Sequence, residues 1–113
     1  MQKGSDVDQI MLLYTTWPDA ETAEATAAEA VAERLCGCVN ILGSARSIYR
    51  WQGAVERAVE TVAVFKTQAG CVERLTRLIQ DRHPYDTPAI VALPVSPVGS
   101  NPAYLAWITE ETA

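Results

Sequence analysis

Histidine is scarce in this chain, because His83 is the only one among 113 residues. A single imidazole excludes a multi-histidine metal site within one copy of the chain. Cysteine is also limited, and the three present are an odd number that does not fit the paired framework of a small secreted protein. These shortages favour a reducing compartment, and they require any metal site to draw on other ligand types or other copies.

Basic residues are few, with 9 Lys and Arg against 14 Asp and Glu and a net charge of −5. DNA, RNA and anionic membranes all call for a basic face, so we expect neither nucleic acid nor a membrane as partner. No stretch approaches the roughly 20 apolar residues of a membrane-spanning helix. The first residues also lack the apolar core of a signal peptide, so we predict a cytoplasmic protein.

The composition that is present is that of an ordinary globular protein, 49% hydrophobic and 20% charged. A chain of 113 residues has room for one domain, because typical domains have roughly 100–150 residues. We predict a flexible N-terminus at residues 1–8 and a single domain at residues 9–113.

The first third of this domain predicts a strand and a helix. Apolar residues without helical spacing predict a strand at 9–16. Asp19 is a suitable N-cap for a helix over 20–36, and Gly37 suits its termination. An i, i+4 repeat predicts the core-facing side of that helix, formed by Ala23, Ala27, Val31 and Leu35.

Residues 38–67 carry the strongest strand signals and turn back on themselves at Gln52-Gly53. Polar and apolar residues alternate near the turn, whereas apolar residues occupy both faces toward the base. This change predicts that the base of the hairpin is covered on both sides. In a one-domain chain the second cover is often another subunit.

The last third predicts a helix over 70–82, whose apolar stripe is Cys71, Leu75, Leu78 and Ile79. It ends before Pro84, because proline disfavours helical geometry at the preceding residue. A strand at 89–95 is directed to a sheet edge by Pro94, and Asn101-Pro102 begins a short C-terminal helix. The order β-α-β-β-α-β predicts an α+β, ferredoxin-like sandwich with an antiparallel sheet.

Two groups of possible ligands each leave two interpretations open. Cys36 and Cys38 could hold a soft metal ion such as Cu(I) or Zn, or could be small buried apolar residues. His83 could be a turn residue bonded to backbone, or a ligand or proton donor shared across an interface.

A third group lies on the hairpin. Glu56, Glu60 and Lys66 share one strand face, and Arg50 lies on the facing strand. They are either cross-strand ion pairs or partly buried groups with a function. The chain has no glycine-rich phosphate loop, nucleophile elbow or HExxH motif, so its residues indicate no reaction.

Six segments together resemble one known family. They are CVNI at 38–41, SIYRWQG at 47–53, Glu60, FKT at 65–67, HPYDTP at 83–88 and YLAWI at 104–108. In this order and spacing they resemble the CutA, or divalent-cation-tolerance, family over residues 9–110, nearly the whole chain.

The resemblance implies a ferredoxin-like subunit in a homotrimer, with the hairpin contributing to contacts between subunits. It also implies a cytoplasmic role in tolerance of divalent metals, copper binding, no accepted catalytic reaction and no obligatory cofactor beyond a possible divalent cation (Cu, Zn). The residues expected at clefts between subunits are Tyr49, Trp51, Glu60, Lys66, His83 and Tyr85, with His83 as the metal ligand.

Two positions differ from copper-binding members that have a cysteine late in the first strand and two adjacent histidines before PY. Tyr14 or Thr15 stands at the first position and Arg82 at the second. Trimer symmetry or a carboxylate such as Glu60 would then have to complete a site around His83.

Other functions remain open beside metal binding. In a trimeric small-molecule sensor that uses the same clefts between subunits, Lys66 and Arg50 would hold an anion while Trp51 or Tyr85 stacks on it. An enzyme would use His83 or Glu60 as a general acid or base, but no nucleophile motif accompanies them. A purely structural trimer acting as a scaffold is the remaining alternative.

Overall fold

The computed structural model describes residues 9–113, so the expectation of a flexible segment at residues 1–8 lies outside the described residues. The elements are β1 (Ile10–Trp17), α1 (Ala20–Ala32), β2 (Cys38–Trp51), β3 (Ala54–Gln68), a 3-10 turn (Ala69–Cys71), α2 (Val72–Arg82), β4 (Ile90–Pro94) and α3 (Pro102–Glu111). The strands form one antiparallel sheet in the order β2-β3-β1-β4. This confirms the α+β prediction and the edge position of β4.

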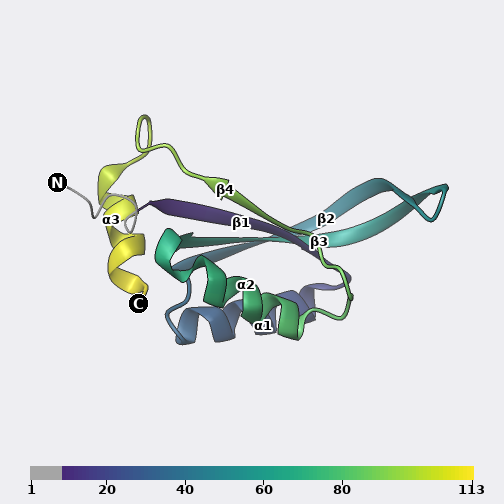
Figure 1. The fold of residues 1–113 in the computed structure, drawn as a ribbon, viewed down its shortest axis with the longest axis horizontal. Coiled ribbons are helices and arrows are strands. Elements are labelled where there is room, and N and C mark those ends of the chain that lie inside the picture. The colour runs from purple at the N-terminus through teal and green to yellow at the C-terminus, as the bar shows by residue number, and fades with distance from the viewer. Residues whose placement is uncertain (1–8) are drawn as a thin grey trace.

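Two helices cover one face of the sheet, as Figure 1 shows for α1 and α2. The third helix, α3, packs at the end of the sheet that lies away from the tip of the β2–β3 hairpin (Figure 1). We call the face opposite α1 and α2 the open face. No helix within residues 9–113 has the length and apolar character needed to cross a membrane.

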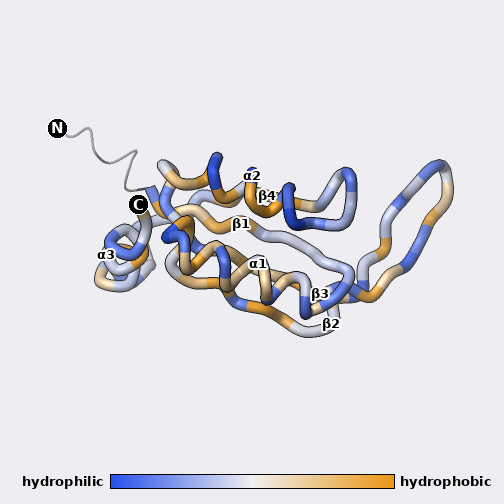
Figure 2. Tube along the Cα trace, turned by 90° about the horizontal axis from the view of Figure 1, so that it is seen from below, coloured by the Kyte–Doolittle hydropathy of each residue, from blue (hydrophilic) through white to orange (hydrophobic). Residues whose placement is uncertain are grey.

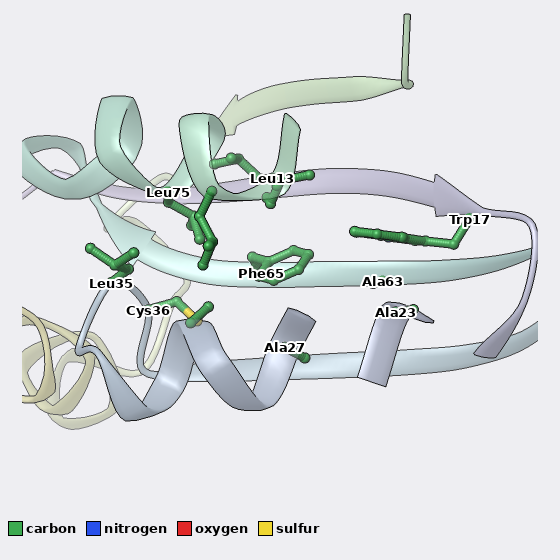
Figure 3. Packing of buried hydrophobic residues seen from close by; sticks show 12 residues of the cluster. Leu13, Trp17, Ala23, Ala27, Leu35, Cys36, Ala63, Phe65 and Leu75 are labelled. Atoms are coloured by element: carbon green, nitrogen blue, oxygen red, sulfur yellow. The ribbon is translucent and has the colours of Figure 1, made fainter. Parts of the chain in front are cut away.

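The core lies between the sheet and the two helices. Leu13 and Trp17 of β1 and Phe65 of β3 are fully buried there, and they face Leu75 of α2 (Figure 3). The alanines of α1 allow this helix to approach the sheet closely, because their side chains are small. The predicted apolar stripe of α2 is buried as expected.

The predicted stripe of α1 was wrong at one position, because Val31 is 42% exposed. A spacing of four residues rotates by about 40° per step on an α-helix, so Val31 has turned well away from Ala23. Ala30, seven residues after Ala23, stays on the buried side. The helix also ends at Ala32 rather than residue 36, where Arg34 takes a left-handed conformation (φ 61°) instead of Gly37.

The β2–β3 hairpin forms an arm that extends beyond α1 and α2 (Figure 2), in a molecule measuring 51 × 27 × 22 Å. Its turn is the predicted one, with positive φ at both Gln52 (50°) and Gly53 (83°), as a type I′ hairpin turn requires. The register shifts between Leu42 and Ser44, which leaves Gly43 as an extra residue. The shift decides which side chains of β2 share a face with those of β3 along the arm.

The open face is apolar and partly uncovered. Tyr14, Leu42, Val91 and Leu93 are exposed there, and the register places Tyr14 opposite Val91. Near α3 the same face is closed, because Ile10 and Gln68 are buried. The predicted two-sided cover of the hairpin base is therefore met within this chain by α1 and α2 on one face and, at one end, by α3 on the other.

Candidate functional site

The predicted site residues fall into two groups on the sheet. One group surrounds His83 and Glu60 where the arm leaves the body, and the other surrounds Lys66 beside α3. Glu60 and Lys66 belong to the same strand and are six residues apart, which is about 20 Å along an extended chain. One copy of the chain therefore does not bring them together.

His83 is held rigidly at the end of α2. It is 7% exposed and stacks on the Trp17 indole, with 4.4 Å between ring centroids. Its Nε2 lies 2.7 Å from the carbonyl oxygen of Thr16, and its Nδ1 lies 3.2 Å from the backbone nitrogen of Tyr85. These partners assign the proton to Nε2, which donates to the carbonyl, and the lone pair to Nδ1, which accepts.

This geometry matches the interpretation of His83 as a turn residue bonded to backbone. The ring nitrogens both have partners within the subunit, so a metal ion at Nδ1 would first have to displace the Tyr85 N–H. The preceding residue, Arg82, donates two hydrogen bonds of 2.9 and 2.7 Å to the Glu29 carboxylate of α1. The guanidinium holds the pKa of Glu29 below its ordinary value.

Tyr85 and Glu60 form the polar part of this group. The Tyr85 ring lies 4.8 Å from the His83 ring. Partial burial and then the negative charge of Glu60 raise the pKa of the Tyr85 phenol, so it stays protonated at neutral pH. The Glu60 carboxylate accepts a hydrogen bond of 2.7 Å from the Ser47 hydroxyl. Sequence reasoning missed Ser47, which the register places on the same face of the arm.

Two further predicted residues lie farther along the arm. Tyr49 pairs with Glu56 and shares the face of Glu60, and it contributes to the raised pKa of Tyr85. Trp51 pairs with Ala54 beside the turn, on the same face, and is exposed. The group at the base of the arm therefore contains Glu60, His83 and Tyr85, with Tyr49 and Trp51 farther toward the arm tip.

The predicted ion pairs of Arg50 do not form. Arg50 pairs with Val55, which puts its side chain on the face opposite Glu56 and Glu60. The ion pairs within residues 9–113 are Arg77–Glu73 and Arg82–Glu29. One copy of the chain does not bring Arg50 and Lys66 together, because 11 residues of β3, about 35 Å, separate Val55 from Lys66. An anion site that uses both residues would need two copies.

Lys66 contacts a residue that sequence reasoning did not place in a site. Its Nζ donates a hydrogen bond of 3.2 Å to the Tyr104 hydroxyl and lies 5.2 Å from the centroid of that ring. Tyr104 in turn stacks with Trp107, with 5.7 Å between centroids. The aromatic residues of the YLAWI segment could be recognised in the sequence. The contact of Tyr104 with Lys66, 38 residues earlier in the chain, could not.

The cysteines behave as packing residues. Cys36 and Cys71 are buried, Cys38 is half-buried, and all three are free thiols. Burial raises the pKa of the Cys36 thiol to about 12, with smaller contributions from the neighbouring thiols. A protonated thiol is a poor metal ligand. Within residues 9–113 no group of three or more His, Cys, Asp and Glu side chains is placed to hold a metal ion.

Known proteins share both the sequence pattern and the fold of this chain. A family model described as CutA1 divalent ion tolerance protein matches residues 11–111. The divalent-cation tolerance protein CutA of Pyrococcus horikoshii is 41% identical over 103 residues, covering 91% of this chain and 98% of the relative.

Solved structures agree with that match. The divalent cation tolerance protein Cut A1 from Thermus thermophilus superimposes with a TM-score of 0.87 at 38% identity, covering 92% of this chain and 99% of that one. The protein from Archaeoglobus fulgidus, described as a periplasmic divalent cation tolerance protein CutA, has a TM-score of 0.84 at 30% identity, with 90% and 97% covered. This chain therefore belongs to the CutA1 divalent ion tolerance protein family.

Proposed function

We propose that this chain works as a cytoplasmic homotrimer in tolerance of divalent metal ions, binding a cation such as Cu(II) or Zn(II) weakly where copies meet. We further propose a binding role without a catalytic reaction. The family membership supplies the link to divalent cations. The uncovered apolar side of the sheet is the observation that carries the assembly.

That apolar surface is continuous across neighbouring strands. Tyr14 of β1 lies opposite Val91 of β4, and Leu12 lies opposite Leu93. Val91 is 51% exposed, as is Leu42 on the other edge of the sheet. Monomeric proteins rarely expose a contiguous apolar surface of this kind unless it contacts something. A second and third copy would cover this apolar surface. The β2–β3 arm projects beyond its own subunit and would contact a neighbouring copy.

The group around Glu60 offers the cation its carboxylate. Three copies would carry three times −5, or −15, which attracts cations and repels anionic polymers. A site of three or more ligands would need a second copy or residues outside 9–113. His83 would join such a site through Nδ1, at the cost of its hydrogen bond from Tyr85. The resulting affinity would be low, because the free protein already satisfies that nitrogen.

The cytoplasmic location rests on the sequence. The three free thiols at residues 36, 38 and 71 suit a reducing compartment. The Archaeoglobus fulgidus protein is called periplasmic, so fractionation of cells that express this chain is the direct test of its own location. Recovery of the protein with periplasmic markers would overturn the cytoplasmic assignment.

Two measurements test the main proposal. Sedimentation equilibrium at low micromolar concentration should give three times the mass of the 12.3 kDa chain, whereas a monomer would contradict the trimer. Calorimetric titration with Cu(II) and Zn(II) should show binding that Glu60→Gln weakens by about tenfold. Glu56→Gln is the matched control, because Glu56 lies on the same face of the same strand.

The titrations also test His83. His83→Gln should weaken binding if its imidazole is a ligand, and circular dichroism checks that this variant is folded. Equal titrations for wild type, Glu60→Gln and His83→Gln would remove both residues from the cation site.

A further inference from the structure

We propose that a pocket between α3 and the neighbouring strands binds a small carboxylate anion with an apolar body. The pocket has a volume of about 290 Å³. Its wall includes Ile10 and Leu12 of β1 and Leu105 and Ile108 of α3. This proposal does not depend on the cation site, which involves the other group of residues.

One side of the pocket carries hydrogen-bond donors. Lys66 and Tyr104 both line it. The Lys66 ammonium has three hydrogens and gives one to the Tyr104 hydroxyl, so two remain for a ligand. The Tyr104 hydroxyl accepts that bond and keeps its own hydrogen to donate. Two adjacent groups that both retain donors are suited to the two oxygens of a carboxylate.

The start of α3 adds to the preference for an anion. Asn101, the N-cap of α3, lines the same pocket and uses its side-chain oxygen to accept from the Ala103 N–H. Its amide NH₂ group therefore remains available as a donor. Because α3 begins at this pocket, the positive end of its dipole also favours a negative charge there. Among residues 9–113, none that lines this pocket is acidic.

The size and wall of the pocket define the body of the ligand. A volume of about 290 Å³ is close to the lower limit of the range of small-molecule pockets, about 300–1,000 Å³. Nucleotides are larger and carry several charges, for which a single ammonium is insufficient. An aliphatic wall beside one cation instead fits a monocarboxylate with a short hydrocarbon or single-ring body.

Benzoate and its neutral analogue benzamide are suitable probes, tested on the assembled protein by calorimetry and by ligand-observed NMR. We expect benzoate to bind at least about tenfold more tightly than benzamide, because hydrogen bonds to a charged carboxylate are stronger than those to a neutral amide. Lys66→Met keeps the length of the side chain and should lose about tenfold in benzoate affinity. Tyr104→Phe should show a smaller loss.

Arg77→Met is the matched control, because Arg77 is an exposed cation on α2. It should bind benzoate as wild type does. Equal binding of benzoate and benzamide, unchanged binding by Lys66→Met, or no benzoate binding at about 1 mM would each overturn the proposal. Loss of the oligomer in Lys66→Met, without any benzoate binding by wild type, would show that the pocket is filled by a second copy and would also overturn it.

Discussion

The His83 imidazole lies against the Trp17 indole with an interplanar angle of 30°. This contact joins the end of α2 to the end of β1, and the hydrogen bond from Nε2 to the Thr16 carbonyl reinforces it. The only histidine of the chain is therefore part of the packing at the base of the arm. Any role in binding a cation is added to that structural role.

Replacing His83 should destabilise the protein. We expect His83→Ala to lower the free energy of unfolding by about 2–4 kcal/mol, because it removes the ring contact and leaves the Thr16 carbonyl without its partner. His83→Phe should lose less, since it keeps the ring. Urea unfolding at one protein concentration measures both variants. A His83→Ala value within about 0.5 kcal/mol of wild type would contradict the packing role.

The close approach of Gly37 to α3 makes a second prediction. A Cβ added at Gly37 would lie 3.2 Å from Cδ1 of Ile108, which is fully buried and has little room to move. Gly37→Ala should therefore cost about 1–3 kcal/mol of stability. Gly43→Ala is the control, because a Cβ there meets nothing within 4 Å. Thermal unfolding compares them, and equal midpoints would show that α3 adjusts without cost.

The buried thiol of Cys36 predicts a dependence of stability on alkaline pH. Burial raises its pKa from 9.0, the ordinary value for a cysteine thiol, to about 12 in the folded chain. Between these values the unfolded chain releases the proton and the folded chain keeps it, so this contribution to stability falls by about 1.4 kcal/mol per pH unit. It is fully present below about pH 9 and is lost as the pH rises.

Paired variants isolate that contribution. The stability of wild type relative to Cys36→Ala should fall by about 2 kcal/mol between about pH 8 and about pH 10.5. Other titrating groups are common to both proteins and cancel. A pH-independent difference for Cys36→Ala would contradict the burial argument.

The open face predicts the effect of a charge on assembly. Val91→Lys should convert the proposed trimer to a folded monomer, since it puts an ammonium into an apolar contact surface. Val31→Lys is the control, because Val31 is similarly exposed but lies on α1, away from the open face. Sedimentation reports the mass of each. A trimer for Val91→Lys, or a monomer for both variants, would remove the open face as the contact surface.

Much of the fold followed from local patterns in the sequence. The turn at Gln52-Gly53, the edge strand ending at Pro94 and the buried stripe of α2 each depend on a few neighbouring residues. The exposed Val31 was missed because an i, i+4 repeat drifts around a helix, and a count over seven residues would have selected Ala30 instead.

The candidate sites were harder to predict, because they depend on contacts between distant parts of the chain. Lys66 contacts Tyr104 only once α3 has packed against the sheet. Neither the strand pattern around Lys66 nor the helix pattern around Tyr104 predicts that contact. The partners of both His83 nitrogens come from backbone at Thr16 and Tyr85, which sequence types do not reveal. The side of the arm that carries Arg50 follows from the turn, since the two-residue turn at Gln52-Gly53 pairs Trp51 with Ala54 and Arg50 with Val55; counting the pairs back from the turn would have revealed it.

The extra residue of β2, Gly43, joins the pairing at the base of the sheet to the pairing that the turn sets in the arm, so it changes which side chains of β2 lie on the open face. Beyond it, odd-numbered residues of β2 continue the open face, so Ser47, Tyr49 and Trp51 accompany Glu56 and Glu60. The opposite side carries three arginines, Arg46, Arg50 and Arg57. The arm is thus electrically two-sided, with its acidic side continuing the apolar surface of the sheet. If Gly43 instead paired with Thr61 as a regular member of the strand, Arg46 would lie opposite Ala58 and Arg50 opposite Ala54, on the side of the glutamates, and the two poles would largely cancel.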